Sequence, residues 1–530
     1  MNVDSQSAPV NVRKRRGERI LIWVGILGIA VILIYCAMDF SSAHTWKQFQ
    51  LQMKAKGESL NFADFIPEPV PDNQNFAIAP IVASSYNQLL DGHGHRFIPP
   101  RTNVLDRMDM DIYPDLTRIS RPTNYISSWV QGKSIDLEAQ QLYFRAVATN
   151  GGLFPVPQLP GLPAQDVIIA LSKYDSNIDE LRMACRLPDS RFPLNYNYYE
   201  ILLPHLGSLN YCDRMLQLRA TAELENGEHD QALEDIKTSL RLVQSIQTEP
   251  FLTSGLIRTT MLIGTVQPIW QGLNEHKWSD NELTNLDDKL NRFDFISDYS
   301  FAIRAERALG IRNLEYVRHT RNLEFLFPES DDDSSDSPYS KAVTKLIREA
   351  FYHSIPDAIF YQNEMTWTKE MQDWCLPIAD VQNQTISPDA EAIAYQMVDN
   401  SRLTPYNIYA NFLISDYPGS ARRFAFAQNA VNMARIACAL ERYRLVYNDY
   451  PQTLDALAPQ FIDKIPHDVI NGQPLKYHRV DDGKFILYSV GWNKTDEGGR
   501  VGMMEGKHYD NRIGDWIWNG TGVTNEMLNP

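Results

Sequence analysis

The sequence predicts a mainly α-helical protein with an N-terminal transmembrane helix, an extracytoplasmic helical domain and a small C-terminal α+β head. Three observations support this fold class: an uncharged apolar run near the N-terminus, apolar residues at helical spacing through the middle, and two strand-like runs near the end. With 530 residues, 44% of them hydrophobic, the chain can bury substantial cores, which excludes wholesale disorder. Its 27 Gly and 30 Pro residues also exclude collagen-like and low-complexity classes.

The apolar run from Ile20 to Met38 is long enough to cross a membrane. It contains no charged residue, and a helix of this length covers roughly 28 Å, close to the roughly 30 Å of a bilayer core. Five basic residues lie between Arg13 and Arg19, and Asp39 follows the run, so the positive-inside rule places residues 1–19 in the cytoplasm. We expect a single-pass protein of the bacterial inner membrane, with the transmembrane helix at 20–38 and the bulk of the chain in the periplasm.

Two other interpretations of the apolar run are a cleaved signal peptide and a lipid-modified Cys36. A signal peptide has a shorter apolar core that ends in small residues, whereas Ile34-Tyr35-Cys36-Ala37 is bulky. The bulk of Tyr35 also disfavours lipid attachment to Cys36. An uncleaved anchor therefore fits the residues best.

The net charge of −16 argues against general nucleic-acid binding. No two of the four cysteines that follow the membrane segment have a C-x-x-C spacing, which removes support for zinc or thioredoxin-like chemistry. One or two disulfides are compatible with an oxidising exterior, but the sequence does not specify their pairing. These four cysteines are Cys185, Cys212, Cys375 and Cys438.

Residues 39–165 are expected to form a juxtamembrane, Pro-rich and largely irregular region. A short helix from His44 to Lys56, ended by Gly57, is predicted directly after the membrane. A stiff, extended linker follows from Ile66 to Asp72 because of its proline density. A second helix is predicted from Asp136 to Thr149.

Residues 166–400 are expected to form the helical domain. The clearest element is a helical hairpin at 211–246, in which Gly227 separates two apolar stripes. The acidic, Ser-rich segment 328–338 is predicted to be a solvated loop, since it lacks the Gly and terminal Glu of an EF-hand. Further helices are expected at 255–273, 280–291, 297–325, 340–354, 357–375 and 388–398.

Residues 420–530 are expected to form the α+β head. A long helix from Ser420 to Tyr447 should end before Tyr450-Pro451. Two strands are predicted at Lys476–His478 and Phe485–Val490, joined by a turn at Asp481-Asp482-Gly483.

The hairpin at 211–246 resembles a single tetratricopeptide unit. Ala220, Ala232 and Ser239 occupy positions where the family has small residues, which let two helices approach closely. His229 stands where the family has Tyr, and no repeat of about 34 residues is visible. The resemblance leaves two interpretations: part of a peptide-binding array or, better supported, a hairpin of a helical bundle.

An ordered set of short motifs follows the long helix of the head, and together with that helix it resembles the periplasmic head of a type II secretion major pseudopilin. The similar region covers about 420–518. Pseudopilins carry a cleavage site directly before the apolar helix, and the fifth residue after this cleavage site is Glu. In this chain Gly17 would be the residue before the cleavage site, and the fifth residue after it is Ile22. Polymerisation as a pilus subunit is therefore not expected. The motifs are Tyr450-Pro451, Leu454 with Leu457, Ile465-Pro466 with Asp468, Gly472 with Tyr477, Tyr488-Ser489 with Gly491 and Asn493, Asp496 with Gly498-Gly499, and Asp515-Trp516.

The pseudopilin resemblance implies a calcium ion in the final loop. Its ligands would be Asn493, Asp496 and Asp515, with backbone carbonyls near Gly498, since oxygen ligands on flexible loops suit Ca²⁺. Asn493 stands where the family usually has Asp, which would weaken binding. The alternative is that these are turn residues that satisfy the local backbone.

The general layout resembles uncharacterised membrane-anchored bacterial proteins with one span, a Pro-rich linker and a helical exterior. The linker is Phe65 to Pro71 in this chain. This resemblance implies a location and no activity.

The sequence contains none of the common hydrolase or nucleotide-binding motifs. One metal-type cluster is present: His93 and His95, which could join Asp109 and Asp111 in a metal-dependent hydrolase site. The alternative for these histidines is an exposed Gly-His turn. The leading functional hypothesis is a non-enzymatic binding or scaffolding protein of the bacterial envelope, in a context that includes secretion, with envelope or secretion proteins as partners. The rival is a membrane-tethered hydrolase that uses the 93–111 cluster.

Overall fold

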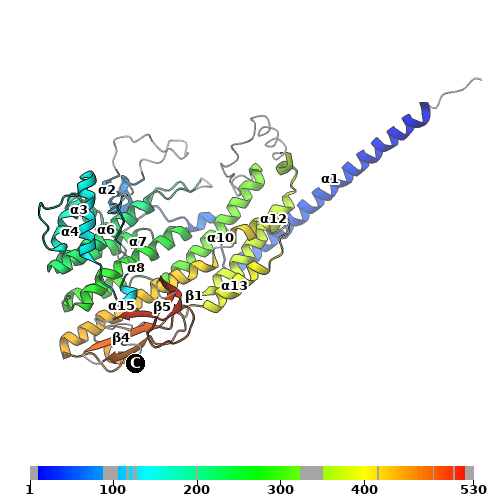
Figure 1. Cartoon of the computed structure of the whole chain (residues 1–530). Helices are drawn as coiled ribbons and strands as arrows, with labels where there is room; N and C mark the ends of the chain where they lie inside the picture. The colour runs from blue at the N-terminus through cyan, green and yellow to red at the C-terminus, as the bar shows by residue number, and fades with distance from the viewer. Residues whose placement is uncertain are drawn as a thin grey trace, which may run out of the picture. The chain divides into compact units, whose positions relative to one another are not determined.

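The computed structural model describes residues 10–86, 106–114, 119–122, 128–197, 201–322, 350–414, 417–480, 483–504 and 508–519. The protein is mainly helical, with 62% helix and 8% strand, and its few small sheets lie near the C-terminus (Figure 1). The expected fold class is confirmed at this level. The His93–His95 pair, the acidic segment 328–338 and most of the predicted helix 340–354 lie outside the described residues.

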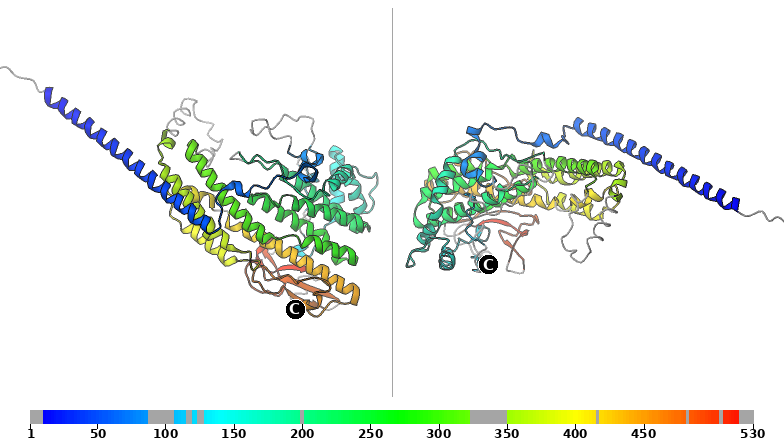
Figure 2. Two further views of the ribbon diagram at one scale, coloured as in Figure 1. Left: turned by 180° about the vertical axis from the view of Figure 1, so that it is seen from behind. Right: turned by 90° about the horizontal axis from the view of Figure 1, so that it is seen from above.

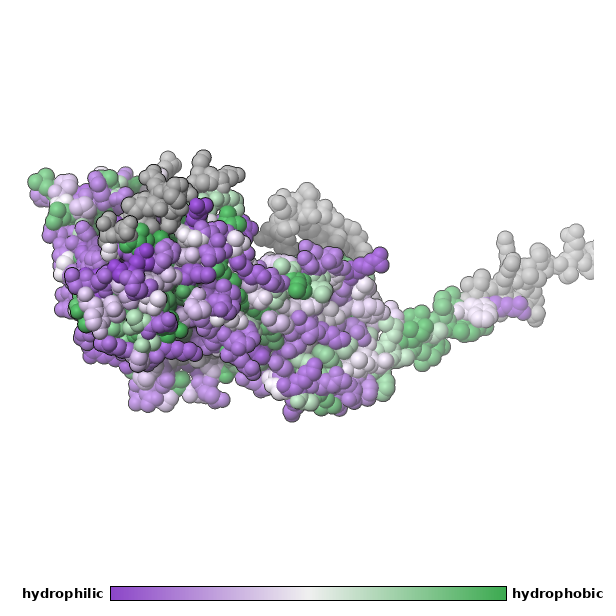
Figure 3. Space-filling model, turned by 90° about the horizontal axis from the view of Figure 1, so that it is seen from below, coloured by the Kyte–Doolittle hydropathy of each residue, from purple (hydrophilic) through white to green (hydrophobic). Residues whose placement is uncertain are grey.

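The first helix is a single element, α1, from Val10 to Ala55. It is long and apolar enough to cross a membrane, and its most apolar window is entirely unburied, visible as the green rod in Figure 3. The prediction of a separate short helix at 44–56 was wrong, because α1 passes from the apolar run into this segment without a break. It ends before Gly57, whose φ of 80° is accessible to glycine at no steric cost, and this stop was predicted.

The chain divides into two compact units, each assembled from segments that are distant in the sequence. Unit 1 contains residues 1–62, 307–370 and 401–414. Unit 2 contains residues 63–306, 371–400 and 415–530. The boundary falls inside α10 (Phe295–Thr320), between Glu306 and Arg307.

In unit 1, α1 packs side by side with α12 (Asp357–Glu370), as Figure 2 shows. The two helices run in the same direction, because Ala358 N donates to Asp39 Oδ1 at 2.7 Å and Lys369 lies over the ring of Phe49. Trp46 and Met53 lie on the buried side of α1.

Two further segments complete unit 1. Trp367 of α12 donates its Nε1–H to Arg307 O of α10 at 2.9 Å, and its indole fills the space left by the missing side chain of Gly310. Asn363 holds the segment that leads into α14 (Ile408–Ile414), with Nδ2 donating to Pro405 O at 2.9 Å and Oδ1 accepting from Tyr409 N at 3.0 Å.

Unit 2 is built around α8 (Leu252–Asn274), which packs against both α6 (His205–Asn226) and α15 (Ala421–Tyr447). Gly255, Gly264 and Gly272 of α8 make room for Phe424, Gln217 and Trp278, respectively, so side chains of neighbouring elements lie against its backbone. The hairpin partner α7 (His229–Ser245) and α9 (Asp280–Leu290) lie nearby. The other helices are α2 (Pro80–Ala83), α3 (Leu137–Gly151), α4 (Pro163–Leu171), α5 (Asp175–Ala184) and α13 (Pro388–Asn400).

The largest sheet is three-stranded and antiparallel, in the order β3 (Lys476–Val480), β4 (Lys484–Ser489), β7 (Trp516–Asn519). The two predicted strands are confirmed as β3 and β4, and Tyr488 of β4 pairs with Ile517 of β7. Two hairpins complete the strands of the described residues: β5 (Val501–Met504) with β6 (His508–Gly514), and β1 (Ala379–Asp380) with β2 (Thr385–Ile386).

Trp129 extends the core of unit 2 from the region predicted to be irregular. It is fully buried, its backbone N–H donates to Gln267 Oε1 at 2.6 Å, and its indole N–H donates to Ile263 O at 2.9 Å. Its ring lies 5.6 Å from that of Trp518 and 6.1 Å from that of Phe426. This residue therefore joins α8, α15 and β7.

Candidate functional site

The C-terminal loops bring the three predicted calcium ligands into one neighbourhood, where each has protein partners. Asp515 is fully buried, and its carboxylate accepts backbone N–H bonds from Gly499 at 2.7 Å, Arg500 at 3.2 Å and Glu497 at 3.4 Å. Burial raises the pKa of Asp515 to about 7, and the charge of Glu497 adds to the rise.

Asp496 lies on the exposed side of the same loop. Its carboxylate accepts from Tyr488 Oη at 2.9 Å and from Gly498 N at 3.1 Å, and it pairs with Lys476 at 3.3 Å. Desolvation alone would raise the pKa of Asp496, but these donors together outweigh it and leave the pKa below its ordinary value.

Asn493 points toward Glu497, a carboxylate that sequence reasoning did not single out. Asn493 Nδ2 donates to Glu497 Oε1 at 2.6 Å, and Asn493 Oδ1 accepts from Thr495 N at 3.1 Å. Glu497 Oε2 is buried and has no hydrogen-bond partner. An orphaned carboxylate oxygen is the kind of group a cation would satisfy.

The arrangement only partly suits a cation. In the described part of the chain, no three His, Cys, Asp or Glu side chains are grouped in a way that could hold a metal ion. Asp515 and Asp496 are engaged by backbone N–H groups, Tyr488 and Lys476. Glu497 Oε2 is the loop oxygen that best fits a ligand role, because it is buried and has no hydrogen-bond partner. Calcium binding through Asn493, Asp496 and Asp515 stays a prediction.

A buried polar cluster fixes these loops to the long helix. Asp468 Oδ1 accepts from Asn429 Nδ2 of α15 at 3.0 Å, Ser489 Oγ of β4 at 2.9 Å and Ile470 N at 2.9 Å. Its other oxygen accepts from Val490 N at 3.0 Å. Asp468 is one of the residues of the pseudopilin-like motifs, but no local pattern indicated that its carboxylate links helix and sheet.

Only half of the predicted hydrolase cluster can be placed. Asp109 is exposed as a residue, yet partial desolvation of its carboxyl by the surrounding protein, together with the charges of Asp106 and Asp111, raises its pKa. Asp106 accepts from Met108 N at 2.8 Å and from Ser208 Oγ at 2.6 Å, and Asp111 accepts from Tyr113 N at 2.9 Å.

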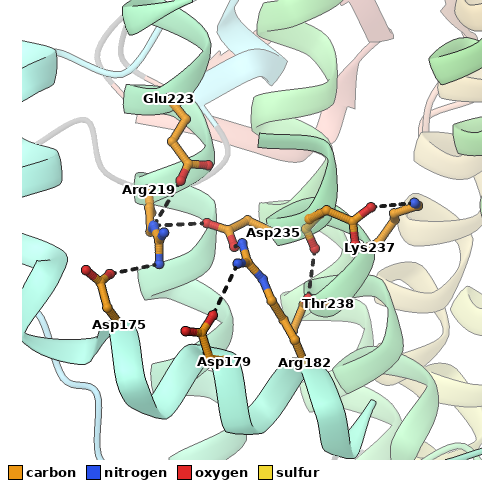
Figure 4. A network of polar contacts seen from close by, with 9 residues as sticks. Asp175, Asp179, Arg182, Arg219, Glu223, Asp235, Lys237 and Thr238 are labelled. Carbon is orange, nitrogen blue, oxygen red and sulfur yellow. Dashed lines mark hydrogen bonds and ion pairs between the residues drawn. The ribbon is translucent and has the colours of Figure 1, made fainter. Parts of the chain in front are cut away.

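The predicted hairpin is confirmed as α6 and α7, and a buried charge network ties it to α5 (Figure 4). Asp235 is fully buried between Arg182 Nη2 at 2.6 Å and Arg219 Nε at 3.4 Å. Arg219 also donates to Glu223 Oε1 at 2.9 Å and lies 3.3 Å from Asp175. Burial and the negative charge of Asp235 raise the pKa of Glu223 to about 8.

A second buried cluster joins the hairpin to α8. Asp213 of α6 accepts from Ser239 of α7, from Thr265 Oγ1 of α8 at 3.2 Å and from Gln217 Nε2 at 2.5 Å. Burial raises the pKa of Asp213 well above its ordinary value. Ser239, expected only as a small residue, therefore also supplies a hydroxyl to the junction of three helices.

The cysteines form no disulfide in this structure. Cys212, Cys375 and Cys438 are buried thiols, and burial raises the pKa of Cys212 and Cys438. Comparisons with protein families, with curated proteins and with solved structures found no match for this chain.

Proposed function

We propose that this protein is a membrane-anchored binding or scaffolding protein of the bacterial cell envelope, with its N-terminus in the cytoplasm and its bulk in the periplasm. The observation that carries the proposal is the continuity of α1, which runs from the unburied apolar segment into the packed face formed by Trp46 and Met53. Because α1 is one continuous helix, the direction of its apolar segment sets the direction of the part that packs within unit 1. A pseudopilin-like head would give the protein a secretion-related context.

The buried charges of the described residues support a structural use of the fold. Asp235, Asp213 and Asp468 are each held by hydroxyl, amide, guanidinium or backbone donors of neighbouring elements. Such networks rigidify a body and specify its packing. A unit with such specified packing, in a chain with a single membrane anchor, is suited to presenting a surface to other proteins.

A pull-down tests the proposed function. Tagged full-length protein, crosslinked in intact cells and then solubilised from membranes, should recover the same envelope or secretion proteins in repeated experiments. The untagged chain, expressed at the same level, is the matched control. Recovery of no partner above this control, with and without crosslinking, would contradict the proposal.

The metal-dependent hydrolase is the second candidate. The charges of Asp106 and Asp111 act on Asp109, but these three carboxylates do not by themselves form a group that could hold a metal ion, so the candidate depends on His93 and His95. Metal analysis of the purified protein separates the alternatives. Stoichiometric zinc or manganese that is lost on His93→Ala would establish the hydrolase-type site. Stoichiometric calcium that survives His93→Ala but is lost on Asp496→Ala is the result expected from the pseudopilin-like loop, and protein free of calcium after dialysis against it would contradict that loop site.

A further inference from the structure

The end of unit 1 from which the apolar segment emerges is defined by a hydrogen bond between two helices. Asp39, the first residue after the apolar run, accepts from Ala358 N in the first turn of α12 at 2.7 Å. Arg321, the residue directly after α10, forms an ion pair with Asp357 at the start of α12. The end of α10 therefore lies beside the first turn of α12. Three elements of unit 1 therefore meet where the apolar run stops.

Beyond the apolar run, two phenylalanines at this end are the most exposed aromatic side chains among the described residues of unit 1. Phe40 of α1 is 78% exposed and directly follows Asp39. Phe351 is 63% exposed in the helical residues 350–354, which precede α12 at this end (Figures 1 and 2). Large aromatic side chains are seldom left in water without a use, and an exposed apolar patch commonly marks an interaction surface.

The position of the two rings identifies the occupant as lipid. With a rise of about 1.5 Å per residue, Phe40 lies roughly 3 Å beyond Met38, within the interfacial layer of several Å that borders the hydrocarbon core. Phe351 belongs to the segment that leads into α12, whose first turn is fixed beside Asp39. Interfacial helices bury Phe and other apolar side chains at the boundary between headgroups and acyl chains.

We infer that Phe40 and Phe351 insert into the interfacial layer of the outer leaflet, so that unit 1 rests directly on the lipid surface. This inference depends on the proposed anchoring by α1. The surface contact adds a second attachment beside the span and restricts the rotation of α1 about its own axis, because Phe351 belongs to a different element from α1.

Photocrosslinking of the full-length protein tests this inference. p-Benzoylphenylalanine replaces Phe40 or Phe351 in protein reconstituted into vesicles of phosphatidylethanolamine and phosphatidylglycerol that contain a clickable acyl-chain lipid. Two matched positions on α1 serve as controls. Leu27, 65% exposed, lies within the span, whereas Leu51, 53% exposed, lies about 20 Å beyond Met38.

We expect lipid adducts at positions 40 and 351 at least severalfold above those at position 51, approaching the yield at position 27. Adduct formation at 351 no higher than at 51, with strong labelling at 27, would overturn the surface contact while leaving the anchor intact. Labelling at 27 as low as at 51 would overturn the anchor and this inference together.

Discussion

Replacing Asp468 by alanine is expected to lower the free energy of unfolding by about 3–5 kcal/mol, because it leaves several buried donors without an acceptor. In this buried cluster the carboxylate accepts from Asn429, Ser489, Val490 N and Ile470 N. The hydrogen bond from Asn429 Nδ2 to Ser489 Oγ, 3.0 Å long, then remains as the direct polar contact between α15 and β4. Denaturant unfolding of the full chain in detergent, followed by tryptophan fluorescence, measures the effect.

Asp463→Ala is the matched control for Asp468→Ala. Asp463 lies five residues earlier in the same connection and is exposed, so its loss should change the free energy of unfolding by no more than about 0.5 kcal/mol. Equal effects of the two substitutions would contradict the structural role assigned to Asp468.

Replacing Asp235 by alanine is expected to cost about 3–5 kcal/mol of stability, because Arg182 and Arg219 then lose their shared buried anion. The matched control is Asp179→Ala, which removes an exposed partner 3.7 Å from Arg182 and should cost no more than about 1 kcal/mol. The same denaturation experiment compares the two. A loss at Asp235 no larger than that at Asp179 would show that the network contributes little.

The same network gives stability a defined dependence on pH. The pKa of Glu223 is raised to about 8 in the folded protein, by burial and by the charge of Asp235, from an ordinary value near 4.5. The folded state therefore holds a proton that the unfolded state releases, so this contribution is fully present below about pH 4.5 and is lost as pH rises through about 8. Asp235→Asn removes the neighbouring charge, and unfolding measured from pH 5 to 8 should show a shallower decline.

Local sequence signals predicted much of the helical framework. Asp136 caps α3 through Ala139 N at 2.9 Å, Gly227 adopts a φ of 84° between α6 and α7, and the turn before Lys484 joins β3 to β4. Each of these depends on residues close in sequence, so periodicity and capping chemistry are sufficient.

Long-range pairings could not be predicted in the same way. Nothing near Trp129 in sequence indicates that its partners are Phe426 and Trp518, about 300 and about 390 residues later. Nor does the sequence indicate that Gly310 leaves space for Trp367. These contacts depend on tertiary packing, which also assembles unit 1 from three separate segments.

The candidate site shows the same limit. Asn493, Asp496 and Asp515 were identified by resemblance and do lie in neighbouring loops, but their hydrogen-bond partners and the buried, unpartnered Glu497 oxygen emerge only from the folded chain. Two separate helices were predicted around the membrane boundary because the composition changes there from apolar to amphipathic. This prediction was wrong, since the helix continues without interruption through Ala55.

Protease accessibility in oriented membranes tests the anchoring by α1 most directly. With an epitope tag at the N-terminus, protease added to spheroplasts should remove nearly all of the chain and leave a short tagged fragment that contains α1. In inverted vesicles the tag should be removed while the remainder stays intact. The opposite pattern, with the body protected in spheroplasts and digested in inverted vesicles, would contradict the proposed orientation and the envelope function that follows from it.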